Sequence, residues 1–273
     1  SILKLMEKMK DKPYSYNTFG YIEDIDNITG KSLYEYYKKV LKEDQIDIFV
    51  LGDFQSNDIK DIFKEYFKID TFKKDNKKVL VKELPIRKRI VRYREYDKVN
   101  QSQLLLLCSL NNLTDYERKY VIKLYNELLG GNSNSILFNT VREKQGYCYY
   151  INSSVKAYDN ILIINSGVEA KNIDKSIKLI KKCMKDITSG KFKDEDIESS
   201  KNTIISAIKA SRDNPISVVN TYFSKVLVGS DSDEERIEAF NRVTKDEIIK
   251  VSKKVTLHTV LTLEPKEDEH EED

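Results

Sequence analysis

Apolar residues recur along the chain with two different periods, and each period predicts one kind of secondary structure. A spacing of three or four residues predicts helices at 2–10, 30–42, 57–67, 114–129, 132–144, 171–189, 193–211, 215–228 and 244–254. Short runs rich in β-branched, leucine and aromatic residues predict strands at 46–54, 87–97, 100–109, 147–155, 160–170 and 256–265. Helices and strands are therefore mixed along the chain, and the leucine-rich run at 100–109 predicts a buried strand.

One helix-to-strand pattern occurs twice. NITGKSLYEYYKKV, residues 27–40, aligns with RVTKDEIIKVSKKV, residues 242–255, at a constant offset of 215 residues. Thr29 matches Thr244, and each copy leads into a predicted strand. Two unrelated helix-to-strand units with common caps would look similar, but we favour an internal duplication.

The duplication has a consequence for domain organisation. The second copy has its own domain upstream, from about residue 87, whereas only 28 residues precede Thr29. If the two domains are homologous, the first one lacks its beginning. The sequence therefore predicts a piece of a longer protein.

Composition and charge narrow the possible functions. The chain has 273 residues, 40% of them hydrophobic, and its 47 basic and 45 acidic residues nearly balance. That balance argues against a nucleic-acid-binding protein, and no apolar run approaches the roughly 20 residues of a membrane span. Three widely spaced cysteines without a CxxC pair support neither a disulfide framework nor a structural zinc site. We therefore expect a cytoplasmic protein.

The stretch FNTVREKQGYCYY combines a basic helix end with closely spaced tyrosines. Arg142 falls on the last helical turn, and a glycine follows before the strand begins. Alternation along the strand predicts Tyr147 and Tyr149 on one face, and Cys148 with Tyr150 on the other. The spacing leaves two interpretations open. Either the arginine is solvated and the tyrosines belong to the core, or arginine and tyrosine together donate hydrogen bonds to a ligand.

The segment GGNSNSILFNTVREKQGYCY, residues 130–149, resembles the partner domain of the insulinase, pitrilysin and mitochondrial processing peptidase family of zinc peptidases. That family shows a Gly-Gly loop, a Ser/Asn-rich turn, a helix ending in Arg-Glu-Lys and a Gly-Leu-Ala-Tyr strand. Here the last motif is GYCY, so a bulkier tyrosine and a small cysteine replace leucine and alanine. The resemblance covers residues 87–265, and residues 1–70 resemble the end of the preceding catalytic domain. The pattern is most similar to bacterial processing-peptidase-like proteins of Gram-positive species.

The resemblance implies an α+β, LuxS/processing-peptidase-like fold in which an antiparallel sheet packs against helices. It implies that residues 1–72 are the C-terminal part of a truncated peptidase-like domain and that 73–86 form a linker. Residues 87–265 would then be a complete C-terminal partner domain, followed by an acidic tail at 266–273.

The resemblance also defines the chemistry to look for. Family members hold zinc through His-x-x-Glu-His and a later glutamate, and the glutamate of the motif is the general base. The two histidines here, His258 and His270, belong to no such motif. The zinc ligands would precede Ser1. We therefore expect zinc in the full-length protein or in a partner subunit, and neither zinc binding nor peptide cleavage by this chain alone.

Carried over residue by residue, the resemblance implies that Arg142 and Tyr149 hold the backbone of a peptide substrate. It implies a homologous peptidase-like domain or subunit as partner, in a homodimer or heterodimer, with no nucleic acid and no membrane. Three roles stay open: part of an active two-domain peptidase, a noncatalytic subunit beside a zinc-bearing one, or a scaffold like the respiratory-complex relatives. The residues before Ser1 would discriminate between these roles.

Overall fold

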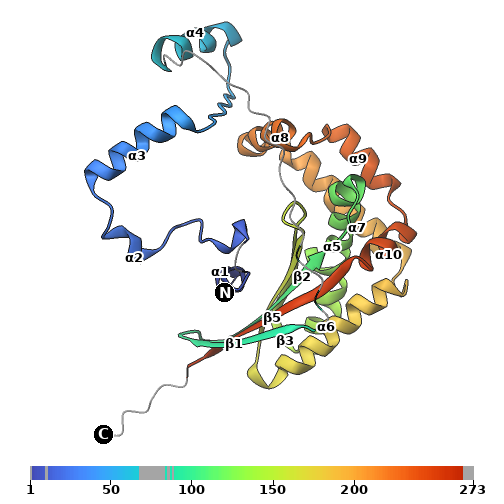
Figure 1. Ribbon diagram of the computed structural model, residues 1–273. Helices are drawn as coiled ribbons and strands as arrows, with labels where there is room; N and C mark the ends of the chain where they lie inside the picture. Colours follow the sequence, from blue (N-terminus) through green and yellow to red (C-terminus); the bar gives the residue numbers. More distant parts are fainter. Residues whose placement is uncertain (1, 10–11, 68–83, 85–86, 88, 267–273) are drawn as a thin grey trace, which may run out of the picture. The chain divides into compact units, whose positions relative to one another are not determined.

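The computed structural model describes residues 2–9, 12–67, 84, 87 and 89–266 (Figure 1). The chain forms two compact units, which are each described by themselves. Unit 1 consists of residues 1–17, 81–209 and 232–273, and unit 2 consists of residues 18–80 and 210–231. The predicted linker at 73–86, apart from Leu84, and the predicted acidic tail, apart from Lys266, lie outside the described residues.

Unit 1 is built on a five-stranded sheet. Its strands are β1 (Val91–Asp97), β2 (Ser102–Leu110), β3 (Cys148–Lys156), β4 (Ile161–Val168) and β5 (Val255–Pro265), in the spatial order β1-β5-β2-β4-β3. The predicted α+β class is confirmed. The sheet is antiparallel except that β1 pairs with β5 in parallel. A parallel pair needs a long crossover connection, and here most of unit 1 lies between the two strands in the sequence.

Helical segments of unit 1 cover the sheet. They are α1 (Ile2–Glu7), α5 (Ile122–Asn126), α6 (Ile173–Thr188), α7 (Asp194–Ser211, whose end reaches into unit 2), α9 (Asp233–Arg242) and α10 (Lys245–Ser252). Short 3-10 turns lie at Pro13–Ser15 and Ala170–Asn172. Wider π-helical turns occupy Glu117–Val121, Glu127–Gly131 and Phe138–Lys144.

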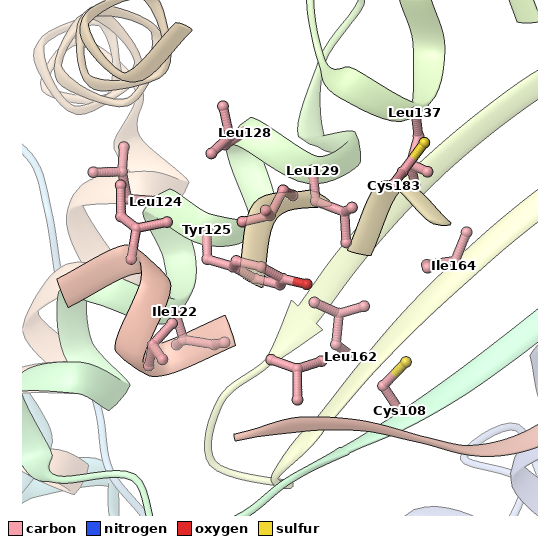
Figure 2. Packing of buried hydrophobic residues seen from close by; sticks show 14 of the residues in the cluster. Cys108, Ile122, Leu124, Tyr125, Leu128, Leu129, Leu137, Leu162, Ile164 and Cys183 are labelled. Carbon is pink, nitrogen blue, oxygen red and sulfur yellow. The ribbon is translucent and has the colours of Figure 1, made fainter. Parts of the chain in front are cut away.

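The buried strand β2 separates two apolar clusters. Leu104, Leu106 and Cys108 belong to the large core beneath the helices, whereas Leu105 and Leu107 belong to a smaller cluster with residues of α1. Figure 2 shows side chains of the large core, with Tyr125 of α5 among leucines and the two cysteines. Burial on both faces explains why the strand reads as a continuous apolar run.

Unit 2 consists mainly of helices: α2 (Ile22–Ile25), α3 (Gly30–Glu43), α4 (Ser56–Phe67) and α8 (Pro215–Val228). The prediction of a strand at 46–54 is wrong, because residues 45–51 have no regular structure. A strand is stable only beside another strand that satisfies its backbone groups. The described part of unit 2 contains no strand that could pair with it.

The helix of the sequence repeat is present in both copies. Thr29 begins α3 and Thr244 begins α10, and each makes a reciprocal capping box with the residue three positions later. The strand of the repeat forms only after α10, as β5. The cap and helix thus agree with a duplication. The strand of the repeat forms only in the second copy, where β5 pairs with β1 and β2.

The two caps give a matched pair of stability predictions. Thr244→Ala should lower the free energy of unfolding by about 1 kcal/mol, because the hydroxyl accepts from the backbone N–H of Glu247 and α10 is packed on the core. Thr29→Ala removes the same cap from α3, which has no buried residue, and should leave the main unfolding transition unchanged. Urea denaturation followed by circular dichroism measures both changes. Equal shifts for the two variants would contradict the difference in packing.

Candidate functional site

A glycine pair brings the helical segment of the predicted site close to the sheet. A Cβ atom at Gly130 would lie 2.7 Å from Oγ of Ser153 and 3.0 Å from the backbone nitrogen of Ser153 in β3. Ser153 Oγ also donates to the backbone oxygen of Asn126, at 3.3 Å. Only a glycine allows this approach without displacement of the strand. The loop is therefore packed directly on the strand that carries Tyr149.

The asparagine-rich turn after this pair is fixed by its own side chains. Asn132 donates from Nδ2 to Oε1 of Glu127 at 2.6 Å, and its Oδ1 accepts from the backbone N–H of Asn134 at 2.6 Å. Asn139 then donates to the backbone oxygen of Asn134 at 2.9 Å. Such side-chain bonds to nearby backbone groups stabilise turns. They fix the turn that leads into the helical segment carrying Arg142.

Arg142 lies on the last turn of the π-helical segment, with its side chain 40% exposed. Its guanidinium lies over the ring of Phe138, at 4.6 Å from the ring centroid. Its nearest carboxylate contact is Oε1 of Glu143 at 3.7 Å, which is longer than a hydrogen bond. No described residue accepts a hydrogen bond from the guanidinium, so its donors are available to a ligand.

A glycine turn joins this helical segment to β3. Gly146 has a φ of +61°, a left-handed conformation that disfavours other residues. Its N–H donates to the backbone oxygen of Arg142 at 2.9 Å, and the N–H of Tyr147 donates to the oxygen of Val141 at 3.1 Å. Two backbone hydrogen bonds thus fix the distance between the helix end and the beginning of the strand.

The beginning of β3 contains a β-bulge, which the strand alternation did not predict. Cys148 pairs with Val168, but Tyr150 pairs with the next residue along β4, Gly167, so Tyr149 is the extra residue. The prediction that Tyr150 shares a face with Cys148 is wrong, because a bulge shifts the alternation by one residue.

The bulge changes which aromatic rings reach solvent. Tyr149 is 59% exposed and Tyr150 is 37% exposed, whereas Cys148 is buried. Tyr150 lies over Gly167, where a Cβ atom would come within 2.4 Å of its ring. Tyr147 precedes the strand and packs against the core. Of the three rings, that of Tyr149 is therefore the one best exposed to a ligand.

Sequence reasoning missed Glu169, whose carboxylate contacts the hydroxyl of Tyr149. The hydroxyl of Tyr149 donates to Oε1 of Glu169 at 3.4 Å, and Glu169 also pairs with Lys171 at 2.8 Å. The hydrogen bond and positive charge of Lys171 lower the pKa of Glu169, and the hydrogen bond from Tyr149 lowers it further. The carboxylate therefore stays ionised and acts as an acceptor, and the phenol is its donor. No motif in the sequence marks Glu169; only the pairing of β3 with β4 brings it here.

The structure thus positions half-buried Arg142 and exposed Tyr149 at one helix-to-strand joint, without a hydrogen bond between them. The charge of Arg142 acts on this joint, because it opposes the rise that burial causes in the pKa of Cys148. Two separate, exposed donors on a backbone held by hydrogen bonds suit an extended ligand with several acceptors. A peptide backbone is such a ligand.

The histidine of the last strand has a structural environment. His258 is buried in β5 and its Nδ1 lies 2.8 Å from Oγ1 of Thr259. Burial, with a smaller effect from the charge of Arg87, lowers its pKa to about 4. His258 lies in a strand, as expected, and His270 lies outside the described residues.

The described residues do not fit a catalytic zinc site. Across the described ranges no three side chains of His, Cys, Asp or Glu gather as metal ligands. The cysteines at 108, 148 and 183 are buried free thiols. No step of a mechanism within this chain is therefore assigned to a metal. Among the helices that the structure describes, none has the length and apolar character needed to cross a membrane.

Comparison with known proteins gives consistent matches. The model of the Peptidase M16 inactive domain matches residues 27–204. A protein of Bacillus subtilis (strain 168) named "Probable inactive metalloprotease YmfF" is 29% identical over 269 residues, which are 96% of this chain and 62% of that protein. The "Uncharacterized zinc protease YmxG" of the same strain is 25% identical over 188 residues, covering 68% of this chain and 44% of that protein.

Solved structures show the same fold. A conserved protein from Enterococcus faecalis V583 superposes with a TM-score of 0.87 at 28% identity, covering 97% of this chain and 63% of that one. A peptidase M16 inactive domain from Pseudomonas fluorescens superposes with a TM-score of 0.72 at 15% identity, covering 97% of this chain and 65% of that one. The chain therefore spans less than two thirds of the length of these relatives.

Proposed function

Since the chain belongs to the family of M16 peptidase inactive domains, as its resemblance to zinc peptidases predicted, we propose that it is a noncatalytic, peptide-binding half of a peptidase-like protein. In this role Arg142 and Tyr149 hold the backbone of a peptide. Any zinc belongs to the rest of the full-length protein or to a partner subunit. Free thiols suit a reducing compartment, so we also propose a cytoplasmic location.

The observation that carries this proposal is the pair of exposed donors at one fixed joint. A guanidinium presents its five N–H donors in a rigid plane and suits the carbonyl oxygens of an extended peptide. A phenol donates one further bond, directed by the bulge that turns Tyr149 outward. A purely structural arginine and tyrosine would be expected to use these donors within the fold. Arg142 has no hydrogen-bond acceptor among the described residues, and Tyr149 has only the long contact to Glu169.

Two versions of the proposal differ in what the rest of the protein does. One relative is named an inactive metalloprotease and matches nearly the whole chain, whereas the one named a zinc protease matches less of it. This difference favours a protein that binds peptides without cleaving them. The alternative is a half of an active, zinc-dependent endopeptidase, in which the same residues would hold the scissile peptide. The zinc content of the purified full-length protein distinguishes the two versions.

Removal of the guanidinium should weaken peptide binding. Arg142→Ala deletes the charge-assisted donors, and each such hydrogen bond contributes about 1.5–3 kcal/mol, so the Kd should rise by at least tenfold. Arg142→Lys keeps the charge but loses the planar fork, and it should give a smaller rise. Fluorescence anisotropy of a fluorescein-labelled, unstructured peptide measures the Kd on the full-length protein.

A nearby lysine provides the control for this measurement. Lys175 lies over the ring of Tyr147, 5.9 Å from its centroid, on helix α6. Lys175→Ala removes one positive charge close to the joint but leaves Arg142 and Tyr149 in their positions. Equal losses of affinity in Arg142→Ala and Lys175→Ala would show that only the local charge matters, and the assignment of Arg142 to a peptide site would be wrong.

A further inference from the structure

Helix α6 concentrates positive charge to a degree that the chain as a whole does not. Its 16 residues include five lysines and two aspartates and thus carry a net charge of +3, whereas the whole chain of 273 residues carries +2. Lys178, Lys182 and Lys185 recur at helical spacing, so they share one face of α6, and all three are exposed. We call these three residues the α6 lysine stripe.

Other charged helices of this chain pair their own cations. Lys201 contacts Glu198 in α7, and Arg236 contacts Asp233 in α9, each about one turn away. The α6 lysine stripe differs from these helices. Within the ranges that the structure describes, no carboxylate lies within ion-pair distance of its lysines. Its positive charges are therefore available to a ligand.

The lysines of the stripe also repel one another. Lys182 lies four residues after Lys178 and three residues before Lys185, and like charges at these spacings destabilise a helix. The two aspartates of α6, Asp174 and Asp186, each contact a cation outside the helix instead. An anionic ligand along the stripe would remove this repulsion, and the relief would add to its binding free energy.

The stripe runs beside the helical segment that carries Arg142. Near the beginning of α6, the ammonium of Lys175 lies 5.9 Å from the ring centroid of Tyr147, which belongs to the helix-to-strand joint of the candidate site. Further along α6, the side chains of Cys183 and Thr140 hydrogen-bond, so the two helical segments are neighbours. The stripe therefore leads away from the joint at which the proposed peptide is held.

The dimensions and surroundings of the stripe fit a short piece of extended peptide. From Lys175 to Lys185 the helix rises about 15 Å, which about four or five residues of extended chain would span. A membrane surface fits less well, because an interfacial helix inserts its apolar side chains into the lipid. The apolar side chains of α6, such as Ile177, Ile180 and Ile187, are buried in the core.

We propose that the peptide held at Arg142 and Tyr149 is acidic, and that the α6 lysine stripe binds a run of aspartate or glutamate side chains next to the held segment. This inference rests on the proposed function, because it names the substrate class of the same site. The ammonium groups attract the carboxylates through solvent. The stripe therefore contributes to affinity and association rate, and its contribution falls as the ionic strength rises.

Two peptides of equal length test the proposal, one with a run of aspartates and one with asparagines in their place. Isothermal titration calorimetry with the full-length protein at low salt should show about tenfold tighter binding of the aspartate peptide, because each exposed charge pair contributes a few-fold. The preference should disappear in about 0.5 M NaCl, where charges are screened beyond a few ångströms.

Variants of the stripe locate the effect. Lys178→Gln, Lys182→Gln and Lys185→Gln, combined in one protein, should abolish the preference but leave the affinity for the asparagine peptide unchanged. Glutamine is a good helix former, so α6 should stay folded. The matched control replaces the same three lysines by arginine, which keeps the charges and should keep the preference.

Other results would overturn the proposal. Equal affinity of the unmodified protein for the two peptides would do so, as would a preference that persists in the glutamine variant. Binding to phosphatidylserine vesicles that is lost in the glutamine variant, without a peptide preference, would assign the stripe to a membrane surface instead. Arg142→Ala separates the two proposals. If it weakens neither peptide, the proposed peptide site is wrong; if it weakens both and the glutamine variant weakens neither, only the stripe is wrong.

Discussion

In an assembly that contains the zinc-bearing half, Tyr149→Phe should lower peptide turnover on the order of a hundredfold. In the version in which a zinc-bearing half completes an active endopeptidase, Tyr149 would donate to the oxyanion on the peptide carbonyl, and loss of such a donor corresponds to about 3 kcal/mol. Folding should be intact, because the ring is exposed and the hydroxyl has only a long contact to Glu169. Steady-state turnover of a fluorogenic peptide gives the effect, with thermal unfolding as the check on stability.

The adjacent tyrosine serves as the matched control. Tyr150 carries the same hydroxyl on the next residue, but its ring lies over Gly167 and it is the less exposed of the two. Tyr150→Phe should therefore change turnover by less than about threefold, since it removes no transition-state donor. Similar losses in both variants would mean that Tyr149 has no special role. Undiminished turnover in Tyr149→Phe would exclude it from the site altogether.

Tyr125 should respond in opposite directions to two substitutions. Its ring is completely buried in the large core (Figure 2), and no described residue hydrogen-bonds its hydroxyl. Tyr125→Ala should lower the free energy of unfolding by about 3–5 kcal/mol, because it leaves a large cavity. Tyr125→Phe removes only the unsatisfied hydroxyl and should raise that free energy by about 1–3 kcal/mol.

Urea denaturation of both Tyr125 variants measures the two changes in the free energy of unfolding. The comparison is sensitive because the two expected changes differ in sign. Burial, with a contribution from the neighbouring Cys108, raises the pKa of Tyr125 strongly, so the phenol stays neutral in the core at any pH where the protein is folded. Destabilisation by Tyr125→Phe would reveal a hydrogen bond to the hydroxyl, for example from a buried water.

Most helices and strands of unit 1 could be predicted from the sequence. The prediction failed where the structure of a segment depends on a neighbouring segment far away in the sequence. Periodicity predicted the helices around α6 and α10, and the leucine run predicted the buried strand β2, because each burial pattern is local. The segment at 46–54 has an equally strong strand propensity. It forms no strand because no neighbouring strand among the described residues pairs with it. The parallel pairing of β1 with β5 could not be predicted either, because the register of two strands distant in the sequence leaves no local pattern.

At the candidate site, side chains were easier to predict than their environment. Arg142 and Tyr149 could be chosen only from the resemblance of the motif, and their role in binding a peptide stays a prediction. The bulge that separates Tyr149 from the regular alternation was not visible, because one inserted residue leaves the composition of a strand unchanged. Glu169 was missed because it follows β4 and meets Tyr149 only through strand pairing.

The position of β5 makes the order of synthesis part of the folding problem. This last strand inserts between β1 and β2, so β1 has no neighbour in the sheet until β5 has left the ribosome. At roughly 5–20 residues per second, β2 waits on the order of ten seconds for that partner with its leucine-rich edge unpaired. An unpaired apolar edge is a template for aggregation. Growing chains of this protein are therefore expected to bind a chaperone until translation passes Pro265.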